Sequence, residues 1–317
     1  MMETALTRWD GRVFTLPALL SCTLEYTAGV PCDSFALRCL WDRGLEGGLA
    51  DLVGFTAWED GQRVFQGVVD ECECRFGDSG STLTVSGRGM AALLLDNEAQ
   101  AADYQTATAA DILRDHVEPY GIQVAGGYRL PPVEGFSVAS GSSEWQVLYD
   151  FARYHGGVAP RFDRQGRLVL SPWQDGERLV IDDKTAVTEL VCREKRYGVL
   201  SEILVRDKTR QQAERMVNRI FAEQGGRCRR VLTMPGRSGY QAMRYRGEFQ
   251  LQRSQAERSR LELTVPQRFF AWPGDLVRLD RTGLGCNGVY RVLEAAVELD
   301  GQGGRTRLVL GEPESVL

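Results

Sequence analysis

Short runs of strand-forming residues fill both ends of this 317-residue chain, and they constrain its fold more than any other feature. From Val13 to Ser86 the runs SCTLEYT, SFALRCLW and STLTVSG are separated by turn residues. The longer run GFTAWEDGQRVFQGVVDECECRF contains an Asp-Gly step, which is a strong local signal for a hairpin. Beyond Gly176 strand-like runs return as RLVIDDK, AVTELVCREKR, VLSEILVRD, SRLELTVPQ, GDLVRLDR, GVYRVLEAAVELDG and RTRLVLGEP. Antiparallel strands in the first block predict a barrel or a sandwich, and the runs of the second block predict a second β-barrel.

The residues between these blocks follow the periodicity of helices. MAALLLD and TAADILRDHVEP each place apolar residues on one helical face. Thr108 and Asp111 have the spacing of a capping box, and Pro119 and Gly121 end the second helix. The run GGYRLPPVEG that follows is typical of an extended linker.

The stretch SSEWQVLYDFARYHGGVAPRFDRQGRLVLSP, residues 142–172, predicts a helix followed by a hairpin. Ser142 or Ser143 can cap the helix, and Gly156 and Gly157 can end it. The runs VAPRF and RLVLSP then alternate around the polar turn at residues 163–166. A unit of this size buries too little surface to be stable alone, so we expect it to pack onto a larger host. The apolar face of its helix consists of Trp145, Leu148, Tyr149 and Ala152.

Two more helices and one strand are predicted in the second half. The residues from Thr209 to Gln224 predict a helix that starts with a capping box at Thr209 and Gln212. GRCRRVLTMPG predicts a strand, and YQAMRYRGEFQLQRSQAE a helix. The apolar face of the helix at 209–224 would consist of Ala213, Met216, Val217, Ile220 and Phe221.

The predicted fold class is therefore mainly β with α+β insertions, in which two related antiparallel β-barrel domains carry a small helix-hairpin module. We expect a first barrel at residues 1–88, with 177–206 as a possible completion, and a helical segment and linker at 89–135. The helix-hairpin module would cover 136–176, and a second barrel with one or two helices would cover 177–317.

Composition agrees with an ordinary folded protein, because 43% of the residues are apolar and 26% are charged. The sequence has no apolar run long enough to span a bilayer, and its start lacks the pattern of a signal peptide. We therefore expect synthesis in a cytoplasm and reduced thiols at the eight cysteines. The charge is uneven: residues 1–175 hold 13 basic and 24 acidic side chains, whereas residues 176–317 hold 25 and 19. This difference fits contact with different partners or between copies, or a drift in surface composition.

The sequence contains residues for four kinds of candidate site. Gly87-Arg88-Gly89 followed by MAA has the form of a dinucleotide-binding turn, but TLTVSG alternates like a half-exposed strand, which favours a structural turn. His116 and His155 are the two histidines, and Cys72 and Cys74 have no second pair nearby, so we expect neither a metal nor a cofactor. The carboxylates of Asp182-Asp183, or of Glu71 with Glu73, could form an acid/base pair for cleaving a glycan, but acidic side chains at such positions are commonly just solvated.

The fourth kind of site is a set of arginines in the second portion of the chain. Lysine is nearly absent there and acidic residues are interleaved, which favours a protein interface over a solvated face or contact with nucleic acid. The candidate interface residues are Arg227, Arg229, Arg230, Arg244 and Arg246.

The order of these segments resembles the baseplate hub proteins of phage tails, which include the late control D proteins, the Mu-type hubs and the hubs of PBSX-like prophages. The resemblance rests on VSGRGMAALLLDNEA, TAADILRDHVEPYGI, the stretch at 142–172 and the terminal FFAWPGDLVRLDRTGLGCNGVYRVLEAAVELDGQGGRTRLVLGEP. Members of that family usually have "GRS" where Gly87-Arg88-Gly89 stands, and glycine at the third position can serve the same turn.

The resemblance implies a structural protein without catalytic activity. Two barrels per subunit would let three subunits form a ring of six barrels that joins a six-fold tail tube to a three-fold spike or tail tip. It further implies tape-measure and LysM-type tail proteins as neighbours, phage DNA that passes through the channel without specific binding, and a place in the virion after assembly in the bacterial host cytoplasm. The alternatives are a tail-associated cell-wall hydrolase, or the hub of a tailocin or other phage-derived injection particle.

Overall fold

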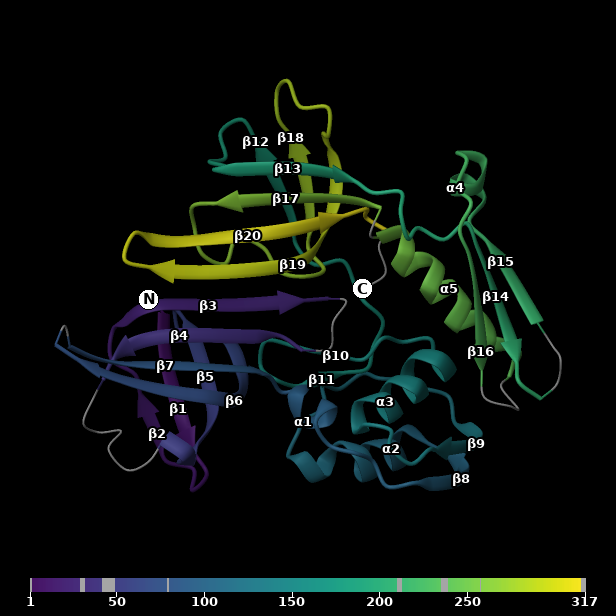
Figure 1. Cartoon of the computed structure of the whole chain (residues 1–317), viewed down its shortest axis with the longest axis horizontal. Coiled ribbons are helices and arrows are strands. Elements are labelled where there is room, and N and C mark those ends of the chain that lie inside the picture. Colours follow the sequence, from purple (N-terminus) through teal and green to yellow (C-terminus); the bar gives the residue numbers. More distant parts are fainter. Residues whose placement is uncertain are drawn as a thin grey trace.

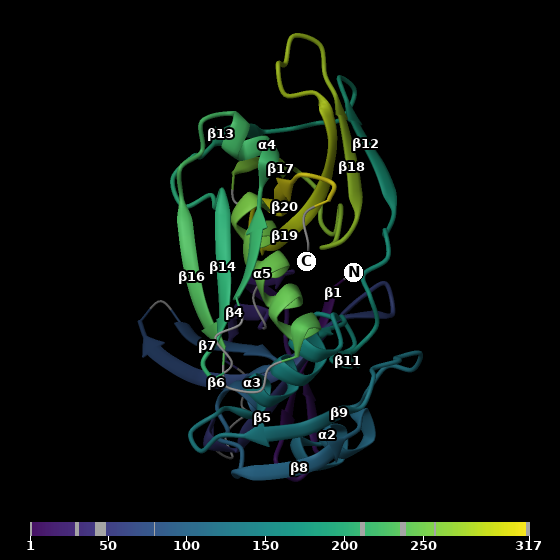
Figure 2. The same cartoon turned by 90° about the vertical axis from the view of Figure 1, so that its right-hand side faces the viewer.

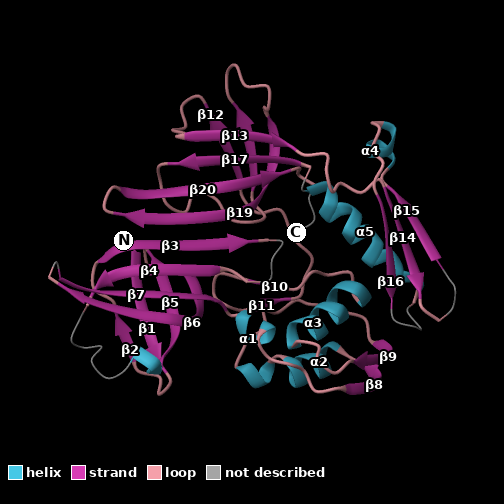
Figure 3. Ribbon diagram, viewed as in Figure 1, coloured by secondary structure: helices cyan, strands magenta, loops and turns pink. Residues whose placement is uncertain are grey.

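In the computed structural model the chain forms two groups of β-strands, a helical segment, and a small sheet with its own helix (Figure 1). The structure describes residues 2–28, 32–41, 49–78, 80–209, 213–234, 239–256 and 258–314. Among these residues no helix has the length and apolar character needed to span a membrane. The predicted fold class, mainly β with helical insertions, is confirmed, and Figure 3 shows strands predominating, with the labelled helices on the right-hand side of the view.

The N-terminal strand group is antiparallel throughout, in the order β3-β4-β7-β6-β5-β1-β2. The β5–β6 hairpin turns at Asp60 and Gly61, whose φ angles of 51° and 78° are left-handed as a tight hairpin turn requires. The Asp-Gly signal is thus confirmed. The strands are β1 (Met2–Arg8), β2 (Val13–Thr15), β3 (Leu19–Thr27), β4 (Ser34–Leu40), β5 (Leu52–Glu59), β6 (Gln62–Gly77) and β7 (Gly80–Gly89).

The C-terminal strand group has the order β13-β17-β20-β19-β18-β12. Its ladders are antiparallel except for that between β12 and β18, which is parallel. Part of the segment 177–206, considered above as a completion of the first barrel, instead forms β12 and β13 in this group. The strands are β12 (Arg178–Asp182), β13 (Glu189–Glu194), β17 (Ser259–Val265), β18 (Leu276–Asp280), β19 (Gly288–Asp300) and β20 (Gly303–Gly311).

The two strand groups join edge to edge, because β3 pairs with β19 in an antiparallel ladder from Thr27 opposite Glu294 to Cys22 opposite Leu299. Figure 1 shows these two strands side by side at the middle of the molecule. A single hydrophobic core continues under both groups and includes Leu24 on one side and Val297 on the other. The sequence patterns gave no sign that the two blocks share one sheet.

The helical segment at 91–172 has one core of its own. The capping box of Thr108 and Asp111 is confirmed, and Ser143 caps the third helix by accepting a hydrogen bond from the Gln146 amide. That helix continues as a π-helical turn at Asp150–His155. The core joins the helices at 92–116 to the helix-hairpin stretch, which therefore packs on a larger host as expected. The elements are α1 (Ala92–Leu95), β8 (Ala102–Ala107), α2 (Ala109–His116), β9 (Val133–Val138), α3 (Glu144–Tyr149), β10 (Arg161–Phe162) and β11 (Leu168–Val169).

The β8–β9 pair was not predicted, and β9 includes the end of the predicted linker. The 163–166 turn of the predicted hairpin is confirmed between β10 and β11.

The remaining elements form a three-stranded sheet covered by a long helix, which Figure 2 shows beside the sheet. The prediction of one helix over 209–224 is wrong: residues 213–217 form a strand, and only a short helix follows it. Met216 lies opposite Ile203 in the ladder and packs against Gly247 of the long helix, so sheet pairing overrides the helical spacing. Gln212 of the predicted capping box lies outside the described residues. The strand β16 confirms the strand predicted in GRCRRVLTMPG, and the helix α5 confirms the helix predicted in YQAMRYRGEFQLQRSQAE. The elements are β14 (Glu202–Asp207), β15 (Ala213–Val217), α4 (Arg219–Glu223), β16 (Arg229–Met234) and α5 (Tyr240–Ala256).

Candidate functional site

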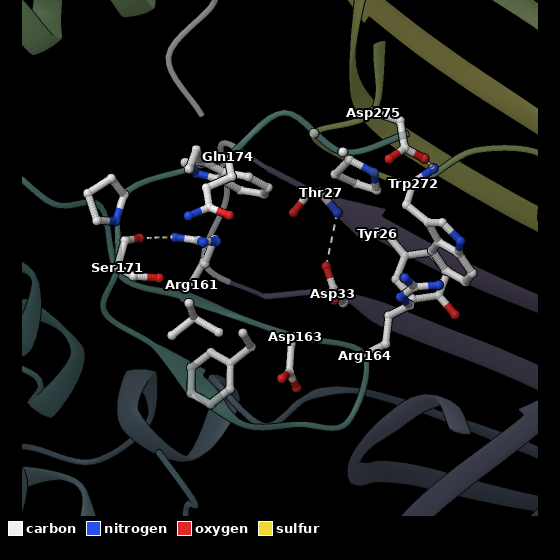
Figure 4. A pocket seen from close by; sticks show the side chains of 17 residues that line it. Tyr26, Thr27, Asp33, Arg161, Asp163, Arg164, Ser171, Gln174, Trp272 and Asp275 are labelled. Carbon is white, nitrogen blue, oxygen red and sulfur yellow. Dashed lines mark hydrogen bonds between the residues drawn. The ribbon is translucent and has the colours of Figure 1, made fainter. Parts of the chain in front are cut away.

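A cleft of about 390 Å³ lies where three parts of the fold meet (Figure 4). The end of β3 supplies Tyr26 and Thr27, the β10–β11 hairpin supplies one wall, and the loop before β18 supplies another. The cleft thus lies between both strand groups and the helix-hairpin stretch. The hairpin and loop residues that line it include Arg161, Asp163, Arg164, Trp173, Trp272 and Asp275.

Two arginines of the hairpin lie over two tryptophan rings in this cleft. The Arg164 guanidinium is 4.0 Å from the ring centre of Trp272, and the Arg161 guanidinium is 4.2 Å from that of Trp173. Arg161 also donates a hydrogen bond to the Ser171 carbonyl at 2.6 Å. A guanidinium over an indole face is attracted by the ring quadrupole. The pair of Arg164 and Trp272 therefore ties the hairpin to the C-terminal strand group.

Two carboxyl groups hold the loops around the cleft. Asp33 accepts a hydrogen bond from the Thr27 amide at 2.9 Å, and burial raises the pKa of Asp33 to about 7. Asp275 accepts hydrogen bonds from the amides of Trp272 and Glu177, each at 2.9 Å, and burial raises its pKa. These contacts make the cleft a junction that fixes three segments relative to one another.

The prediction of a structural turn at Gly87-Arg88-Gly89 is wrong in position: these residues are the end of strand β7, and the turn begins at Met90. β7 pairs with β4 on one side and with β6 on the other, both antiparallel. A side chain at Gly87 would meet the Val68 carbonyl oxygen at 2.0 Å, so only glycine fits there. The Arg88 guanidinium contacts Asp70 of β6 at 2.7 Å and Asp96, just after α1, at 2.6 Å. Arg88 thus links the N-terminal strand group to the helical segment.

His116 belongs to a buried polar cluster in the core of the helical segment. Its Nδ1 atom is 2.6 Å from Glu144 Oε2, and its Nε2 atom is 3.1 Å from the Tyr104 hydroxyl. The Tyr120 hydroxyl donates to Glu144 Oε1 at 3.0 Å. Both ring nitrogens of His116 are therefore engaged, and the cluster joins α2 to α3. His155 is half-buried and packs edge-on against Phe136.

The five candidate interface arginines do not share one surface. Arg229 lies on the face of the small sheet turned away from α5 and pairs with Glu202 at 3.0 Å, whereas Arg244 pairs with Glu248 along α5 at 2.6 Å. Arg246 is half-buried, and its guanidinium lies 5.0 Å from the centre of the Tyr154 ring. The other two are exposed: Arg227 donates to the Gly226 carbonyl at 3.1 Å, and Arg230 is on β16.

The carboxylates considered for acid/base work are placed in turns and on a strand. Asp182 accepts hydrogen bonds from the amides of Lys184 and Thr185, and Asp183 accepts from the Thr282 amide. Glu71 and Glu73 lie exposed on β6. Within the described part of the chain no group of three or more His, Cys, Asp or Glu side chains can hold a metal ion.

Part of the chain matches the model of a known protein family. Residues 91–172 match the family model described as the second domain of gp44-like baseplate hub proteins. A comparison with curated protein sequences returns no match.

Three solved structures share the fold over nearly the whole chain. A 43 kDa tail protein of prophage MuSo2 from Shewanella oneidensis aligns with a TM-score of 0.80 and 18% identity, over 99% of this chain and 100% of that one. A tail protein from Neisseria meningitidis MC58 aligns with a TM-score of 0.78 and 18% identity, over 99% and 98%. The prophage tail protein gp18 from Listeria monocytogenes EGD-e gives 0.61 and 12%, over 97% and 94%.

These matches confirm the resemblance to phage baseplate hub proteins that the sequence indicated, through the family segment at 91–172 and through the fold. The matched residues coincide with the helical segment at 91–172, which has its own core.

Proposed function

We propose that this chain is a structural subunit of the baseplate hub in a phage or phage-like tail, and that three copies close into a ring. The observation that carries this proposal is the β3–β19 ladder, which fixes two strand groups side by side within one chain. Three chains of this kind present six strand groups around one axis, while the assembly itself remains three-fold. Such a ring suits a six-fold tail tube on one side and a three-fold spike or tail tip on the other.

Opposite net charges on the two portions of the chain would favour contact between neighbouring copies in the ring. The first portion of the chain carries an excess of 11 acidic side chains over basic ones, and the second an excess of 6 basic ones. In the proposed ring the exposed arginines of the second portion, Arg227, Arg229, Arg230 and Arg244, pair with acidic side chains on more than one surface of the neighbouring copies, because the fold puts Arg229 and Arg244 on different sides of the small sheet. Arg246 is half-buried and contacts the Tyr154 ring of its own chain.

The proposed partners are a tail tube protein, a spike or tail-tip protein, and tape-measure and LysM-type tail proteins. Phage DNA would pass through the channel without specific contacts, and assembly would take place in the host cytoplasm before the ring becomes part of the virion. The helix-hairpin stretch would widen the ring and contact neighbouring subunits. A tailocin or other injection particle would use the same ring.

Light scattering after size-exclusion chromatography tests the stoichiometry. We expect a species of three chains of 35.3 kDa each, formed alone or after addition of the tail tube protein from the same gene cluster. A protein that stays a single chain at micromolar concentration with either the tube or the spike protein present would contradict the proposal.

A further inference from the structure

Two free thiols from distant parts of the chain meet at the surface of the C-terminal strand group. The Sγ atoms of Cys192 and Cys286 are 2.7 Å apart, although the residues are 94 positions apart in sequence. Cys192 lies on β13 and is exposed, and Cys286 lies half-buried in the loop between β18 and β19. Two thiols this close can be joined with little movement of the backbone.

Hydrogen bonds hold the loop that carries Cys286. Asn287 closes the loop, because its Oδ1 accepts from the Arg281 amide at 2.9 Å and its Nδ2 donates to the Arg281 carbonyl at 2.7 Å. The Arg281 guanidinium in turn donates to the carbonyl of Thr185, between β12 and β13, at 2.9 Å. The Tyr290 hydroxyl donates to the carbonyl of Cys286 itself at 2.7 Å.

Strand pairing fixes the position of Cys192, the other thiol of the pair. Cys192 is paired with Leu261 of β17 in the antiparallel ladder. β13 ends the 13-stranded sheet on this side, whereas β18 and β12 are at the opposite side of the C-terminal group. A bond between Cys192 and the loop after β18 would therefore connect the two ends of this group.

We infer that Cys192 and Cys286 form an intramolecular disulfide under oxidising conditions, and that this bond closes the C-terminal strand group covalently. The inference rests on the placement of the two thiols and is independent of the proposed function. It adds an oxidised state to the reduced thiols expected in a cytoplasm.

The chemistry is a two-step exchange with a small-molecule disulfide such as oxidised glutathione. The exposed Cys192 thiol loses its proton, and the thiolate attacks the reagent, which forms a mixed disulfide and releases one thiolate. Cys286 then loses its proton and attacks the Cys192 sulfur, which releases the second thiolate. The protein loses two protons and two electrons, and the reagent is reduced to two thiols. Burial and the neighbouring Cys286 thiol raise the pKa of Cys192 to about 11, so the first step becomes faster as pH rises above neutrality.

The remaining cysteines provide internal controls. Cys22 and Cys39 are buried in the main core, and burial raises the pKa of Cys22 to about 12. Cys72 and Cys74 lie two residues apart on β6 and are both half-buried, so they serve as a comparison pair with a different geometry.

The test is oxidation of the full chain with oxidised glutathione at about pH 8.5, which is near the ordinary pKa of a thiol. The remaining thiols are then blocked, and the chain is digested with trypsin without reductant and analysed by mass spectrometry. Cleavage after Lys184 and Arg193 and after Arg281 and Arg291 gives peptides 185–193 and 282–291, each with one cysteine. We expect these peptides as one cross-linked species that joins two cysteines of the same chain, and the mass of the denatured chain should fall by about 2 Da because two hydrogen atoms leave. Cys74→Ser should leave this product unchanged, whereas Cys286→Ser should stop the reaction at glutathione bound to Cys192.

Thermal unfolding provides a second measurement. Oxidation should raise the midpoint of the unmodified chain and not that of Cys192→Ser, because the bond constrains a 94-residue loop of the unfolded chain. The inference is overturned if peptides 185–193 and 282–291 remain unlinked after complete reaction with the reagent. It is also overturned if Cys192 retains glutathione while Cys286 is present, or if the cross-link joins two different chains.

Discussion

Thr27 of β3 lies opposite Glu294 of β19, and from this pair onward the N-terminal strand group continues into the C-terminal group as one sheet. The hydrophobic core under the two groups is also shared. A chain built this way holds its two halves in one fixed orientation. The account of the protein as a ring subunit depends on this relationship.

Loss of the Leu24 side chain should destabilise both strand groups together. Leu24 is fully buried on β3, in the core common to both groups. We expect Leu24→Ala to lower the free energy of unfolding by about 2–5 kcal/mol, from lost burial and the cavity left behind. Leu20→Ala on the same strand is the matched control, because Leu20 is 41% exposed and its loss should cost within about 0.5 kcal/mol. Urea unfolding followed by tryptophan fluorescence measures both, and two separate transitions for Leu24→Ala would contradict a shared core.

Removal of the Arg88 charge should raise the pKa of Asp96. Hydrogen bonds from Arg88 lower this pKa in the folded protein. We expect Arg88→Gln to return the pKa of Asp96 toward its ordinary value, as measured by NMR titration of the carboxyl carbon. Arg75→Gln is the control, since Arg75 pairs with Glu73 at the far end of β6. An unchanged Asp96 titration in Arg88→Gln would show that Arg88 does not link the strand group to the helical segment.

Glu202 should make the small sheet sensitive to acid. Hydrogen bonds from Arg215 first, and also from Arg229, lower the pKa of Glu202 to about 2. Because the folded pKa is below the unfolded one, the stabilisation is present above the ordinary glutamate pKa and is lost as pH falls through about 2. We expect Glu202→Gln to be less stable than the wild type at pH 7, with the difference vanishing near pH 2. A difference independent of pH would mean that the carboxylate charge plays no part, and Arg215→Met tests the same contact from the other side.

The contribution of Asp33 to stability should depend on pH in the opposite sense to that of Glu202. Burial raises its pKa to about 7, so the folded state binds the proton more tightly than the unfolded state. The contribution to stability is therefore fully present below the ordinary aspartate pKa and is lost as pH rises through about 7. We expect Asp33→Asn to be close to the wild type at pH 4 and more stable at pH 8, as measured by thermal unfolding. The account of this carboxyl fails if Asp33→Asn is equally destabilised at both pH values.

Local signals in the sequence predicted much of the fold. The Asp60-Gly61 turn, the capping box at Thr108 and the strand runs act over a few residues, and the structure contains them. The strand β15 was missed because Met216 and Val217 fit a helical face as well as opposite faces of a strand. Only pairing with β14 and the space at Gly247 distinguish these two readings, and both come from distant parts of the chain.

The candidate site was less predictable for the same reason. Arg164 and Trp272 are 108 positions apart, and nothing local to either residue indicates that they stack. The fold spreads the arginines chosen from composition over β16, the loop before it and α5, so they lie on different sides of the small sheet. Composition indicates how many charges a segment has, but the topology determines which of them share a surface.

Electron microscopy of the purified chain with its tail tube protein tests the central claim most directly. We expect two-dimensional class averages of a hollow ring with three-fold symmetry, in which six similar densities surround the axis because each copy contributes two strand groups. Class averages that show single chains, an open filament, or a closed ring whose copy number is not three would contradict the account.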